Sequence, residues 1–319
     1  MSNAASVLLL PHIQVQNANA ISGPMSWGFP SPTAFTGFVH ALERKLRHQI
    51  DISLGGVGIV CHRFEPQISK PTQGYNQTFR LTRNPFNTGW KPFEDGPTAI
   101  IEEGRAHLEV SLLIEVKNEV DPDEQEELLE ALSVLYTMRI AGGSILQSRK
   151  PDLIEWFDSE EDNVKPFRKL RRKLLPGFAL VLREDLLQKH IAELQESTPE
   201  KPVDSLEALL DFIRIQSSAV GPDPKDEEQT LWERDKKPEE GWFVPVPVGY
   251  AAISPLYEPG VALRTRDEQT PFRFVESLYS LGAWVSPHRV DRLEKLLWHA
   301  ETAVESGIYK CNNQWEDKE

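Results

Sequence analysis

Residues 8–46 constrain the fold most, because they read as a strand, a tight turn and a helix in direct succession. Residues 8–16 are apolar with weak alternation, which is typical of a strand, and glycine and proline break the chain over 17–30. Ser31 can cap the helix that follows, and Pro32 suits its first turn, where a missing N–H costs nothing. Apolar side chains then recur at helical spacing, at Phe35, Phe38, Val39, Leu42 and Leu46. We therefore predict that the first strand packs against the first helix.

The next segments predict a mixed α+β fold. Residues 57–64 read as a second strand. Residues 105–117 alternate so regularly that one strand face is wholly apolar, while the other is mixed and therefore open or partly covered. Asp121 begins a second helix, whose expected buried face comprises Leu128, Leu132, Leu135 and Tyr136. Residues 174–182 supply a fourth strand, and the order βαββαβ is that of a ferredoxin-like or RRM-type unit.

This reading divides the chain into three parts. Residues 5–185 form the RRM-like core, with a hairpin-bearing insertion at about 66–104. Residues 186–240 contain two short helices, at 186–194 and 203–215. A charged, proline-rich loop that we expect to be mobile completes this second part, from 220 to 240.

The third part, residues 241–319, is a C-terminal extension that packs on or beside the core. It begins with an edge strand or extended segment at 241–250, which contains two prolines. Ser286 and Pro287 then begin a last helix, whose apolar side chains are Val290, Leu293, Leu297 and Ala300. The sequence leaves open whether this part returns to the first sheet or forms a small lobe.

The overall charge limits the classes of function. The chain carries 35 Lys and Arg against 49 Asp and Glu, so its net charge is −14. Proteins that bind nucleic acid through bulk electrostatics are usually basic, so any RNA contact here needs cations concentrated in one place. Cys61 and Cys311 alone form neither a disulfide framework nor a zinc site, and no apolar run is long enough to span a bilayer. The expected location is a reducing cytoplasm, without a membrane partner.

The segment 66–93 is the best local candidate for RNA contact. It contains Lys70, Arg80, Arg83 and Lys91 with interleaved aromatic residues, and it has no Asp or Glu. Cations neutralise phosphates, and aromatic or guanidinium planes stack on unpaired bases. The alternative is a solvated loop whose aromatic side chains anchor it to the core.

Two further segments are candidates for contact with an anion or an RNA backbone. Residues 139–144 include Gly142 and Gly143, which permit positive φ and expose backbone N–H groups, although a simple helix-ending turn explains them equally well. Residues 165–173 contain six cations, which indicate a phosphate or protein contact or else a solvated helix end.

The sequence offers one weak candidate for catalysis. It has no metal-binding motif and no Gly-x-Ser-x-Gly motif, so we expect no metal and no cofactor. His62 and His107 fall on adjacent predicted strands and could act as acid and base in RNA cleavage. Histidines with ordinary structural hydrogen bonds are the more common explanation of such a pair.

Several motifs, in order along the chain, resemble a known family. They are NANAIS at 17–22, WGFPSP at 27–32, FTGFVHAL at 35–42, GVGIVCHRFE at 56–65, LTRNP at 81–85, EEGRAHLEVSLL at 102–113, AGGSIL at 141–146, LLPGFALV at 174–181 and FVESLYSLGAWVSPHRV at 274–290. With these blocks over most of its length, the chain resembles the second Csy subunit of type I-F CRISPR surveillance complexes. In that family, which belongs to the RAMP superfamily, the subunit caps the guide RNA.

The resemblance implies a non-catalytic structural subunit. Its expected partners are the five-prime, repeat-derived handle of the CRISPR RNA, the large subunit of the complex, the backbone subunit, and target DNA near the protospacer-adjacent motif. The alternative function is a metal-independent CRISPR RNA endoribonuclease on the same fold, using His62 or His107. A third hypothesis is a protein-binding adaptor without RNA contact.

The residues expected to bind RNA come from regions that the family motifs place near RNA, and the choice of individual side chains is our inference. We select Asn17, Asn19, Ser22 and Trp27 from the first turn, Arg80 and Arg83 from the insertion, Arg105 and His107 from the open sheet face, Arg139, Gly142, Gly143 and Ser144 from the glycine loop, and Arg171 and Arg172 from the basic run. We expect no catalytic residue.

Overall fold

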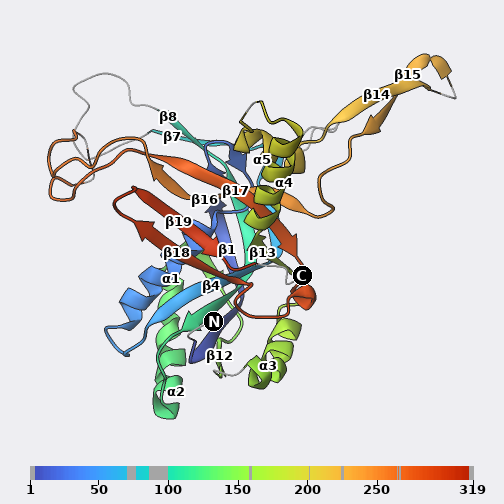
Figure 1. Ribbon diagram of the computed structural model, residues 1–319. Coiled ribbons are helices and arrows are strands. Elements are labelled where there is room, and N and C mark those ends of the chain that lie inside the picture. The colour runs from blue at the N-terminus through green and yellow to red at the C-terminus, as the bar shows by residue number, and fades with distance from the viewer. Residues whose placement is uncertain are drawn as a thin grey trace.

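The structure is a computed structural model of the 319-residue chain, and it describes residues 4–69, 77–85, 100–157, 160–200, 202–223, 226–263, 265 and 267–315. Within these ranges the fold is mixed α+β, as predicted, and most strands join one 11-stranded sheet (Figure 1). The predictions for Lys70 and Lys91 lie outside the described residues.

The first half of the sheet has four antiparallel strands in the order β11, β1, β9, β4. Helix α1 connects β1 to β4, and helix α2 with the 3-10 helix η1 connects β9 to the β10–β11 hairpin. The bounds are β1 Ser6–Asn19, α1 Pro32–Leu46, β4 Leu54–Pro66, β9 Arg105–Val116, α2 Pro122–Ala131, η1 Leu132–Thr137, β10 Arg139–Ile140 and β11 Gly143–Gln147. The first three predicted strands and the first helix are confirmed.

Helix α1 begins where the sequence predicts. The Ser31 side-chain oxygen accepts a hydrogen bond from the Thr33 backbone N–H at 3.1 Å, and Pro32 occupies the first turn. The whole predicted apolar face is buried, at Phe35, Phe38, Val39, Leu42 and Leu46. Local capping and helical periodicity were therefore sufficient to define this helix.

Helix α2 also starts as predicted, with a capping box between Asp121 and Glu124. Its expected buried face is correct at Leu128, Leu132 and Leu135, but Tyr136 is exposed. The helix tightens into η1 at residue 132. A 3-10 helix has about 3 residues per turn instead of 3.6, so each residue turns further about the axis, and Tyr136 moves off the buried face.

The fourth strand of this half is not the predicted one. Residues 174–182 do contain a strand, β13 (Phe178–Leu182), but it pairs with β4 and with β17 (Val275–Val285), on the far side of β4 from β1. The strand beside β1 is β11, which the chain reaches through a two-residue turn with φ of 48° at Ala141 and 75° at Gly142. Positive φ at both positions is typical of a tight type I′ hairpin. The glycine loop therefore begins a strand as well as following a helix.

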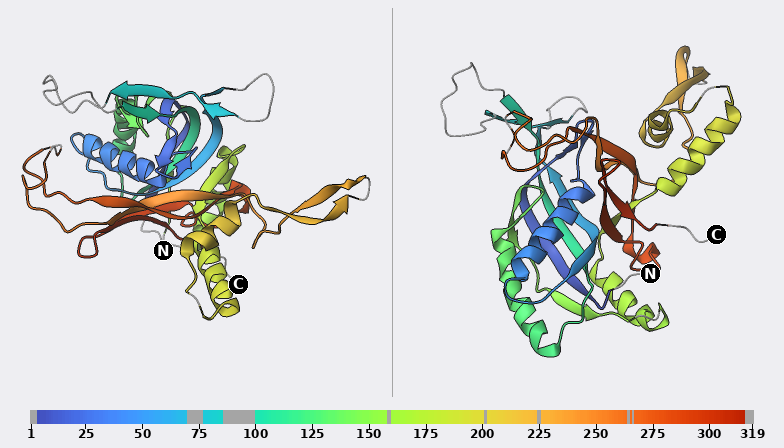
Figure 2. Two further views of the ribbon diagram at one scale, coloured as in Figure 1. Left: turned by 90° about the horizontal axis from the view of Figure 1, so that it is seen from above. Right: turned by 60° about the vertical axis from the view of Figure 1, so that its left-hand side comes forward.

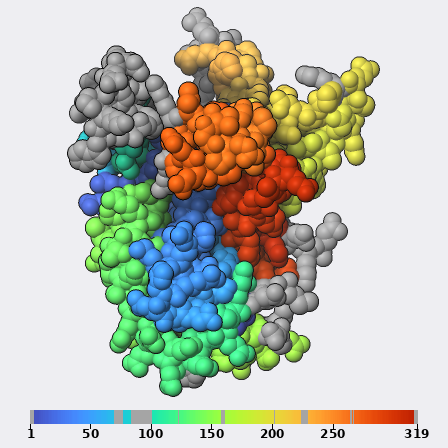
Figure 3. All heavy atoms as spheres, turned by 90° about the vertical axis from the view of Figure 1, so that its left-hand side faces the viewer, coloured from blue at the N-terminus to red at the C-terminus, as the bar shows by residue number. Residues whose placement is uncertain are grey.

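The C-terminal part returns to the same sheet. Strands β17, β16 (Phe243–Ala252), β19 (Ile308–Asn313) and β18 (Leu297–Ala303) follow β13, and β18 pairs back onto β4 with Trp298 opposite Val57. Helix α1 lies between the two halves, with β4 on one side and β16, β18 and β19 on the other (Figure 2). In Figure 3, α1 (blue) is seen at the surface between the segment that contains α2 (green) and the β18–β19 hairpin (red). One helix thus supports both halves.

The predicted last helix is wrong. Only Pro287–Arg289 form a helical turn, the 3-10 helix η2, before the chain enters β18. The apolar residues of the prediction are buried at Val290, Leu293 and Leu297, but through a loop and a strand, and Ala300 is exposed. Pairing of β18 with both β4 and β19 outweighs the helical spacing, since strand formation depends on neighbours that are distant in sequence.

The prediction of an edge strand or extended segment at 241–250 holds only for part of β16, because this strand lies between β17 and β19 in the sheet. Pro245 and Pro247 lie in the part of β16 that pairs with β17, whereas β19 pairs with residues 249–251. A strand tolerates proline where one of its edges has no ladder partner.

Residues 184–240 form an arm whose helices pack on β16 and β17 and whose hairpin projects away from the sheet. Helices α4 (Glu184–Ser197) and α5 (Ser205–Ile213) confirm the two predicted short helices. The prediction of a loop at 220–240 is largely wrong. Instead, β14 (Ser217–Asp223) and β15 (Asp226–Arg234) form a hairpin that extends away from the molecule (Figure 1). Thr230, Leu231 and Trp232 favour a strand here despite the charged residues and prolines around them.

The remaining elements are short. In the insertion, β5 (Ile68–Ser69) pairs with β6 (Thr78–Phe79), and β7 (Thr82–Pro85) pairs with β8 (Ile100–Glu103). After β1, β2 (Ile21–Gly23) pairs with β3 (Ser26–Trp27). Strand β12 (Asp152–Glu155) pairs with the start of β1 and precedes helix α3 (Glu160–Lys173). Among the described helices, none is long and apolar enough to cross a membrane.

Two apolar cores lie on opposite faces of the first half-sheet. One fills the space between the sheet, α1 and α2. The other contains Val7, Leu9 and Leu113 and is completed by α3, α4, α5 and β17. It covers only one end of that face, so β9 is buried from Val110 onward while Arg105, His107 and Glu109 remain partly accessible. The prediction of a partly covered sheet face is confirmed.

Candidate nucleic-acid interface

A groove of about 740 Å³ opens at the end of the sheet where β1 finishes and the insertion begins. Its walls come from the end of β1, the first turn of α1, the β10–β11 turn and strands β16 and β19. Among its lining residues are Asn19, Ser22, Arg105, Arg139, Gly142 and Tyr309. We call it the Arg105–Arg139 groove. Five of these six residues were selected from the sequence alone.

The two arginines are held in place by the backbone around them. Arg105 Nη1 donates to the Asn17 carbonyl oxygen at 3.2 Å, and its Nη2 donates to Glu103 Oε2 at 2.6 Å. Arg139 Nη1 donates to the Gly142 carbonyl oxygen at 3.0 Å, across its own hairpin turn. Asn17 adopts a φ of 57° in an irregular part of the β1–β9 ladder, which turns its carbonyl toward Arg105. The side chains are therefore oriented, and within the described ranges Arg105 has a carboxylate partner while Arg139 has none.

The start of α1 adds a favourable site for an anion. The first turn contains no acidic residue, and Ser31 and Thr33 line the groove. A helix N-terminus carries partial positive charge, which favours an anion even though the Thr33 and Ala34 N–H groups here already donate to Ser31. On the other wall, Tyr250 and Tyr309 stack with ring centroids 6.3 Å apart. Cations, a helix N-terminus and aromatic rings are the groups that contact phosphates and bases.

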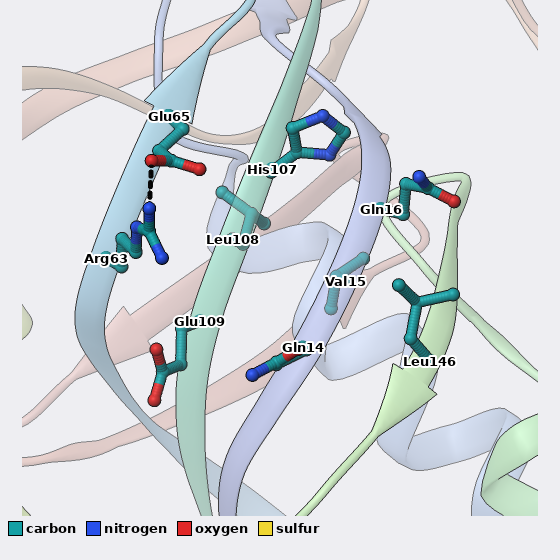
Figure 4. Close-up of a pocket in the computed structure, with 9 residues that line it drawn as sticks. All are labelled: Gln14, Val15, Gln16, Arg63, Glu65, His107, Leu108, Glu109 and Leu146. Atoms are coloured by element: carbon teal, nitrogen blue, oxygen red, sulfur yellow. Dashed lines mark hydrogen bonds and ion pairs between the residues drawn. The ribbon is translucent and has the colours of Figure 1, made fainter.

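A smaller pocket of about 230 Å³ lies on the partly covered sheet face (Figure 4). Polar side chains from three adjacent strands point into it, namely Gln14 and Gln16 of β1, His107 and Glu109 of β9, and Arg63 and Glu65 of β4. Arg63 and Glu65 form an ion pair, so this sheet-face pocket has mixed charge. The Asn17 backbone N–H donates to His107 Nδ1 at 3.3 Å, which connects the pocket to the end of β1 beside the groove.

Several selected residues of the first turn have structural roles as well. The Asn19 side chain closes a local turn, accepting from the Ile21 N–H and donating to the Ile21 carbonyl, both at 3.0 Å. The Ser22 hydroxyl lies 3.0 Å from that of Ser26. Trp27 remains 45% exposed and packs against Phe79 of the insertion, with ring centroids 5.1 Å apart.

Gly143 and Ser144 belong to β11 rather than to an open loop. A Cβ on Gly143 would lie 2.7 Å from the Ala18 backbone nitrogen and 2.8 Å from the Gln16 carbonyl oxygen. The close approach that this glycine permits is therefore to the protein's own β1. Ser144 is exposed and pairs in register with Gln16 and Arg139.

Arg80 and Arg83 have partners within the insertion. Arg80 Nε donates to Ser69 Oγ at 3.2 Å, and Arg83 Nε donates to Glu102 Oε1 at 3.0 Å. The segment 66–93 lacks acids in sequence, but β8 brings Glu102 and Glu103 alongside β7. The local excess of positive charge is therefore smaller than the sequence indicated.

Arg171 and Arg172 lie far from the groove. Their helix, α3, ends at Lys173, which pairs with Asp152 of β12, and Asp152 is opposite Leu9 of β1. Ten residues of strand, or about 33 Å, separate Leu9 from Asn19. Arg171 is also occupied, since its Nη1 donates to the carbonyl oxygens of His288 at 3.1 Å and Val290 at 2.6 Å. Figure 1 shows α3 and the insertion at opposite ends of the molecule.

The two histidines of the cleavage hypothesis are kept apart. His107 is opposite Glu65 in the β4–β9 ladder, whereas His62 lies three residues away at an irregularity, about 10 Å along the strand. His62 instead stacks on His12, with ring centroids 4.1 Å apart. Within the described ranges, no group of three or more His, Cys, Asp or Glu side chains comes together as a metal site would require.

A chain of hydrogen bonds holds the His62 ring in place. Its Nδ1 lies 2.6 Å from the Pro176 carbonyl oxygen and must donate to it, and its Nε2 lies 2.6 Å from the Ser111 hydroxyl, from which the neutral ring accepts. Ser111 Oγ in turn accepts the His12 backbone N–H at 3.0 Å. Burial lowers the pKa of His62, and the positive charges of the neighbouring His12 and Arg149 lower it further. The Pro176 bond and the Glu109 carboxylate oppose this shift.

We expect the free energy of unfolding to fall as the pH drops below about 6.5, the ordinary pKa of histidine. Because the folded-state pKa of His62 is lower than this value, the unfolded state takes up a proton first and stability is lost with acidification. Urea denaturation at pH 7.5 and 5.5, on the wild type and on His62→Gln, measures the effect. A pH dependence that is unchanged in His62→Gln would assign it to another group.

Sequence reasoning missed the aromatic residues that the C-terminal part brings to this end of the sheet. Tyr250 and Tyr309 are 59 positions apart and meet only because β16 pairs with β19. The sequence placed both residues in the C-terminal extension, 241–319, but did not show where that extension packs. The only available signal was the clustering of aromatic residues in the segment 241–250.

Fold and groove together define a mixed α+β protein with a candidate nucleic-acid interface at one end of its sheet. The family model described as CRISPR-associated protein (Cas_Csy2) matches residues 8–311. The CRISPR-associated protein Csy2 of Pseudomonas aeruginosa (strain UCBPP-PA14) is 48% identical over 323 aligned residues, covering 97% of this chain and 96% of that protein. The chain therefore belongs to the Csy2 family of type I-F CRISPR systems, which confirms the resemblance noted from its motifs.

Proposed function

We propose that the chain is a non-catalytic structural subunit of a type I-F surveillance complex that holds the five-prime, repeat-derived handle of the CRISPR RNA in the Arg105–Arg139 groove. The single observation that carries this proposal is the convergence of Arg105, Arg139 and the acid-free start of α1 on one groove. Glu103 also lines the groove and pairs with Arg105, so Arg139 and the start of α1 supply most of the local positive charge that can neutralise phosphates in this acidic chain.

The fold supports the same proposal. We infer that β1, α1, β4, β9, α2 and β11 form a ferredoxin-like unit of the RAMP type, since their order in the sheet and their helical connections fit βαββαβ. In such units the open sheet face and the adjacent loops are the surfaces that contact single-stranded RNA. The sheet-face pocket and the Arg105–Arg139 groove occupy these two positions.

The acidic remainder of the surface suits protein partners. The projecting arm, residues 184–240, carries sixteen Asp and Glu against seven Lys and Arg, which disfavours RNA contact there. We propose that such surfaces face the large subunit and the backbone subunit, with target DNA nearby, in the cytoplasm. A structural rather than catalytic role is supported by His62, whose ring nitrogens are both engaged by neighbouring protein groups.

The proposal predicts that Arg105→Glu combined with Arg139→Glu removes the guide RNA. The tagged chain is co-expressed with the other subunits and a CRISPR array, and the RNA that co-purifies is sequenced and quantified. Losing two charge-assisted contacts should reduce repeat-derived five-prime ends at least about tenfold. The matched control is Arg168→Glu with Arg172→Glu, two exposed cations on α3 that should leave RNA recovery unchanged.

Undiminished RNA in the groove variant would contradict the proposal. If the protein subunits still assemble without any dependence on RNA, the chain is an adaptor. If the purified chain cleaves repeat RNA without metal and loses this activity in His62→Ala, the endoribonuclease hypothesis replaces it.

A further inference from the structure

A second hollow, of about 670 Å³, adjoins the Arg105–Arg139 groove. It lies between the β2–β3 turn, the end of β4 and strands β13, β16 and β17. The aromatic members of its walls include Trp27, Phe178, Trp242 and Trp284, and we call it the aromatic groove. It shares Ser22 and Pro30 with the Arg105–Arg139 groove and Arg63 with the sheet-face pocket. The aromatic groove therefore borders each of the other two hollows.

The aromatic side chains of this groove are unusually accessible. Trp242 is 58% exposed and Phe178 44%, and their rings meet edge to face at 5.4 Å. Trp284 packs beside Trp242, with ring centroids 6.2 Å apart, and Trp27, which also lines the groove, is 45% exposed. Single exposed apolar residues are normal on a protein surface, but a cluster of large aromatic rings around one hollow indicates a binding site.

The groove is already formed in the isolated chain. The Met25 backbone N–H donates to the Tyr279 hydroxyl at 2.9 Å, and the Ser31 hydroxyl donates to the Pro247 carbonyl at 2.7 Å. The first bond attaches the β2–β3 turn to β17, and the second attaches the start of α1 to β16. A further bond of 3.0 Å, from the Trp284 N–H to the Trp242 carbonyl, fixes the backbone of Trp242. A ligand would therefore meet little ordering cost.

The charge of the lining favours a planar group attached to an anion. Arg63 lines the groove, and no carboxylate does so among the residues that the structure describes. The partner of Arg63, Glu65, lies outside the lining, and both side chains are largely solvated, so their ion pair is weak and exchangeable. In a chain of net charge −14, such a surface is suited to nucleobases whose phosphates lie beside it.

We propose that the aromatic groove stacks unpaired bases of the RNA strand whose phosphates occupy the Arg105–Arg139 groove, with Trp242 and Phe178 as the stacking platform. This inference rests on the proposed function and deepens it, because it assigns base contacts to residues of β13 and β16 or their flanks. Stacking is tolerant of sequence, since every base has a π face. The groove then contributes affinity for unpaired RNA, while the arginines position the backbone.

The test compares Trp242→Leu with Trp232→Leu in the full chain. Trp232 is 63% exposed on the β15 hairpin and is not part of the groove lining, so it is a matched control. The probes are fluorescein-labelled single-stranded RNA of the CRISPR repeat sequence and the same strand with abasic riboses. Fluorescence anisotropy gives the dissociation constants, and thermal denaturation checks that each variant is folded.

We expect Trp242→Leu to weaken binding of the base-bearing RNA about tenfold and to leave binding of the abasic strand unchanged. Trp242→Phe, which keeps an aromatic ring, should restore most of the affinity, and Trp232→Leu should change neither constant. Equal binding of the base-bearing RNA by wild type and Trp242→Leu would overturn the inference. So would an equal loss for both probes, or a loss confined to assembly with protein subunits, which would assign the groove to a protein partner.

The failure of this inference is distinguishable from that of the proposed function. If Arg105→Glu with Arg139→Glu loses RNA while Trp242→Leu does not, the Arg105–Arg139 groove binds RNA but the aromatic groove does not stack its bases. If the arginine variant also retains RNA, the proposed function itself is wrong.

Discussion

Replacing Trp298 by alanine is expected to lower the free energy of unfolding by about 3–5 kcal/mol, a large part of the 5–15 kcal/mol typical of a folded domain. Trp298 is fully buried, with 0% of its surface exposed. It lies opposite Val57 where β18 pairs with β4, and its Nε1 donates to the Leu180 carbonyl of β13 at 2.8 Å. One side chain thus joins the C-terminal hairpin to the two strands at the centre of the sheet. Its removal leaves a cavity and an unpaired carbonyl.

Urea denaturation of the wild type and of Trp298→Ala measures this loss. Trp232→Ala is the matched control, because Trp232 is 63% exposed and should change stability by no more than about 0.5 kcal/mol. If the two alanine variants were equally stable, β18 would not be an integral part of the fold. The C-terminal part would then be an independent lobe, as one reading of the sequence allowed.

The substitution Gly143→Val is expected to cost about 1–3 kcal/mol and to separate β11 from β1. The added Cβ would lie 2.7 Å from the Ala18 nitrogen and 2.8 Å from the Gln16 carbonyl oxygen, and both are backbone atoms that cannot rotate away. Because β10 and β11 carry Arg139 to the groove, their displacement should also weaken RNA binding by the assembled complex.

Gly37→Ala is the control for Gly143→Val. Gly37 lies inside α1, and an added Cβ would meet no atom within 4 Å. Alanine favours a helix over glycine, so this variant should be more stable by up to about 1 kcal/mol. Denaturant unfolding and amide hydrogen exchange of β11 distinguish the two effects. Unchanged exchange in Gly143→Val would show that the β1–β11 ladder tolerates the side chain.

The elements that were predicted correctly are those with local causes. Ser31, Pro32 and the apolar periodicity of α1 act within a few residues, as do Asp121 and Glu124 at the start of α2. The strict alternation of β9 likewise defined its two faces. In each case the stabilising interaction lies close in sequence to the residue that signals it.

The predictions that were wrong concern interactions between segments that are distant in sequence. The residues from Val290 to Leu297 have helical spacing, but β4 and β19 hold the end of this segment as a strand. Residues 178–182 are a strand as predicted, but nothing local could reveal that they pair with β4 and β17 instead of β1. Strand pairing is a contact between distant segments, so sequence alone underdetermines it.

The candidate site divides in the same way. Arg105, Arg139, Asn19 and Ser22 could be chosen from the sequence because turns, glycines and alternation identify the ends of strands. The basic run at 165–173 looked equally suitable, yet the length of β1 places it at the other end of the molecule, and Arg171 serves as an anchor for η2. Trp242 and Phe178 could not be assigned to any site until β13, β16 and β17 were arranged side by side.

The sequence by itself determined the family, the mixed α+β class, the first strand and helix, and the need for a local concentration of cations in an acidic chain. Tertiary structure alone decided which strand completes the first half-sheet, that α1 is shared by both halves, and which cations meet. The physical reason is the separation along the chain over which each interaction acts. Caps, turns and periodicity act between neighbours in the chain, whereas a groove for a charged ligand depends on strand order and on carboxylates, such as Glu102 opposite Arg83, that distant segments bring into contact.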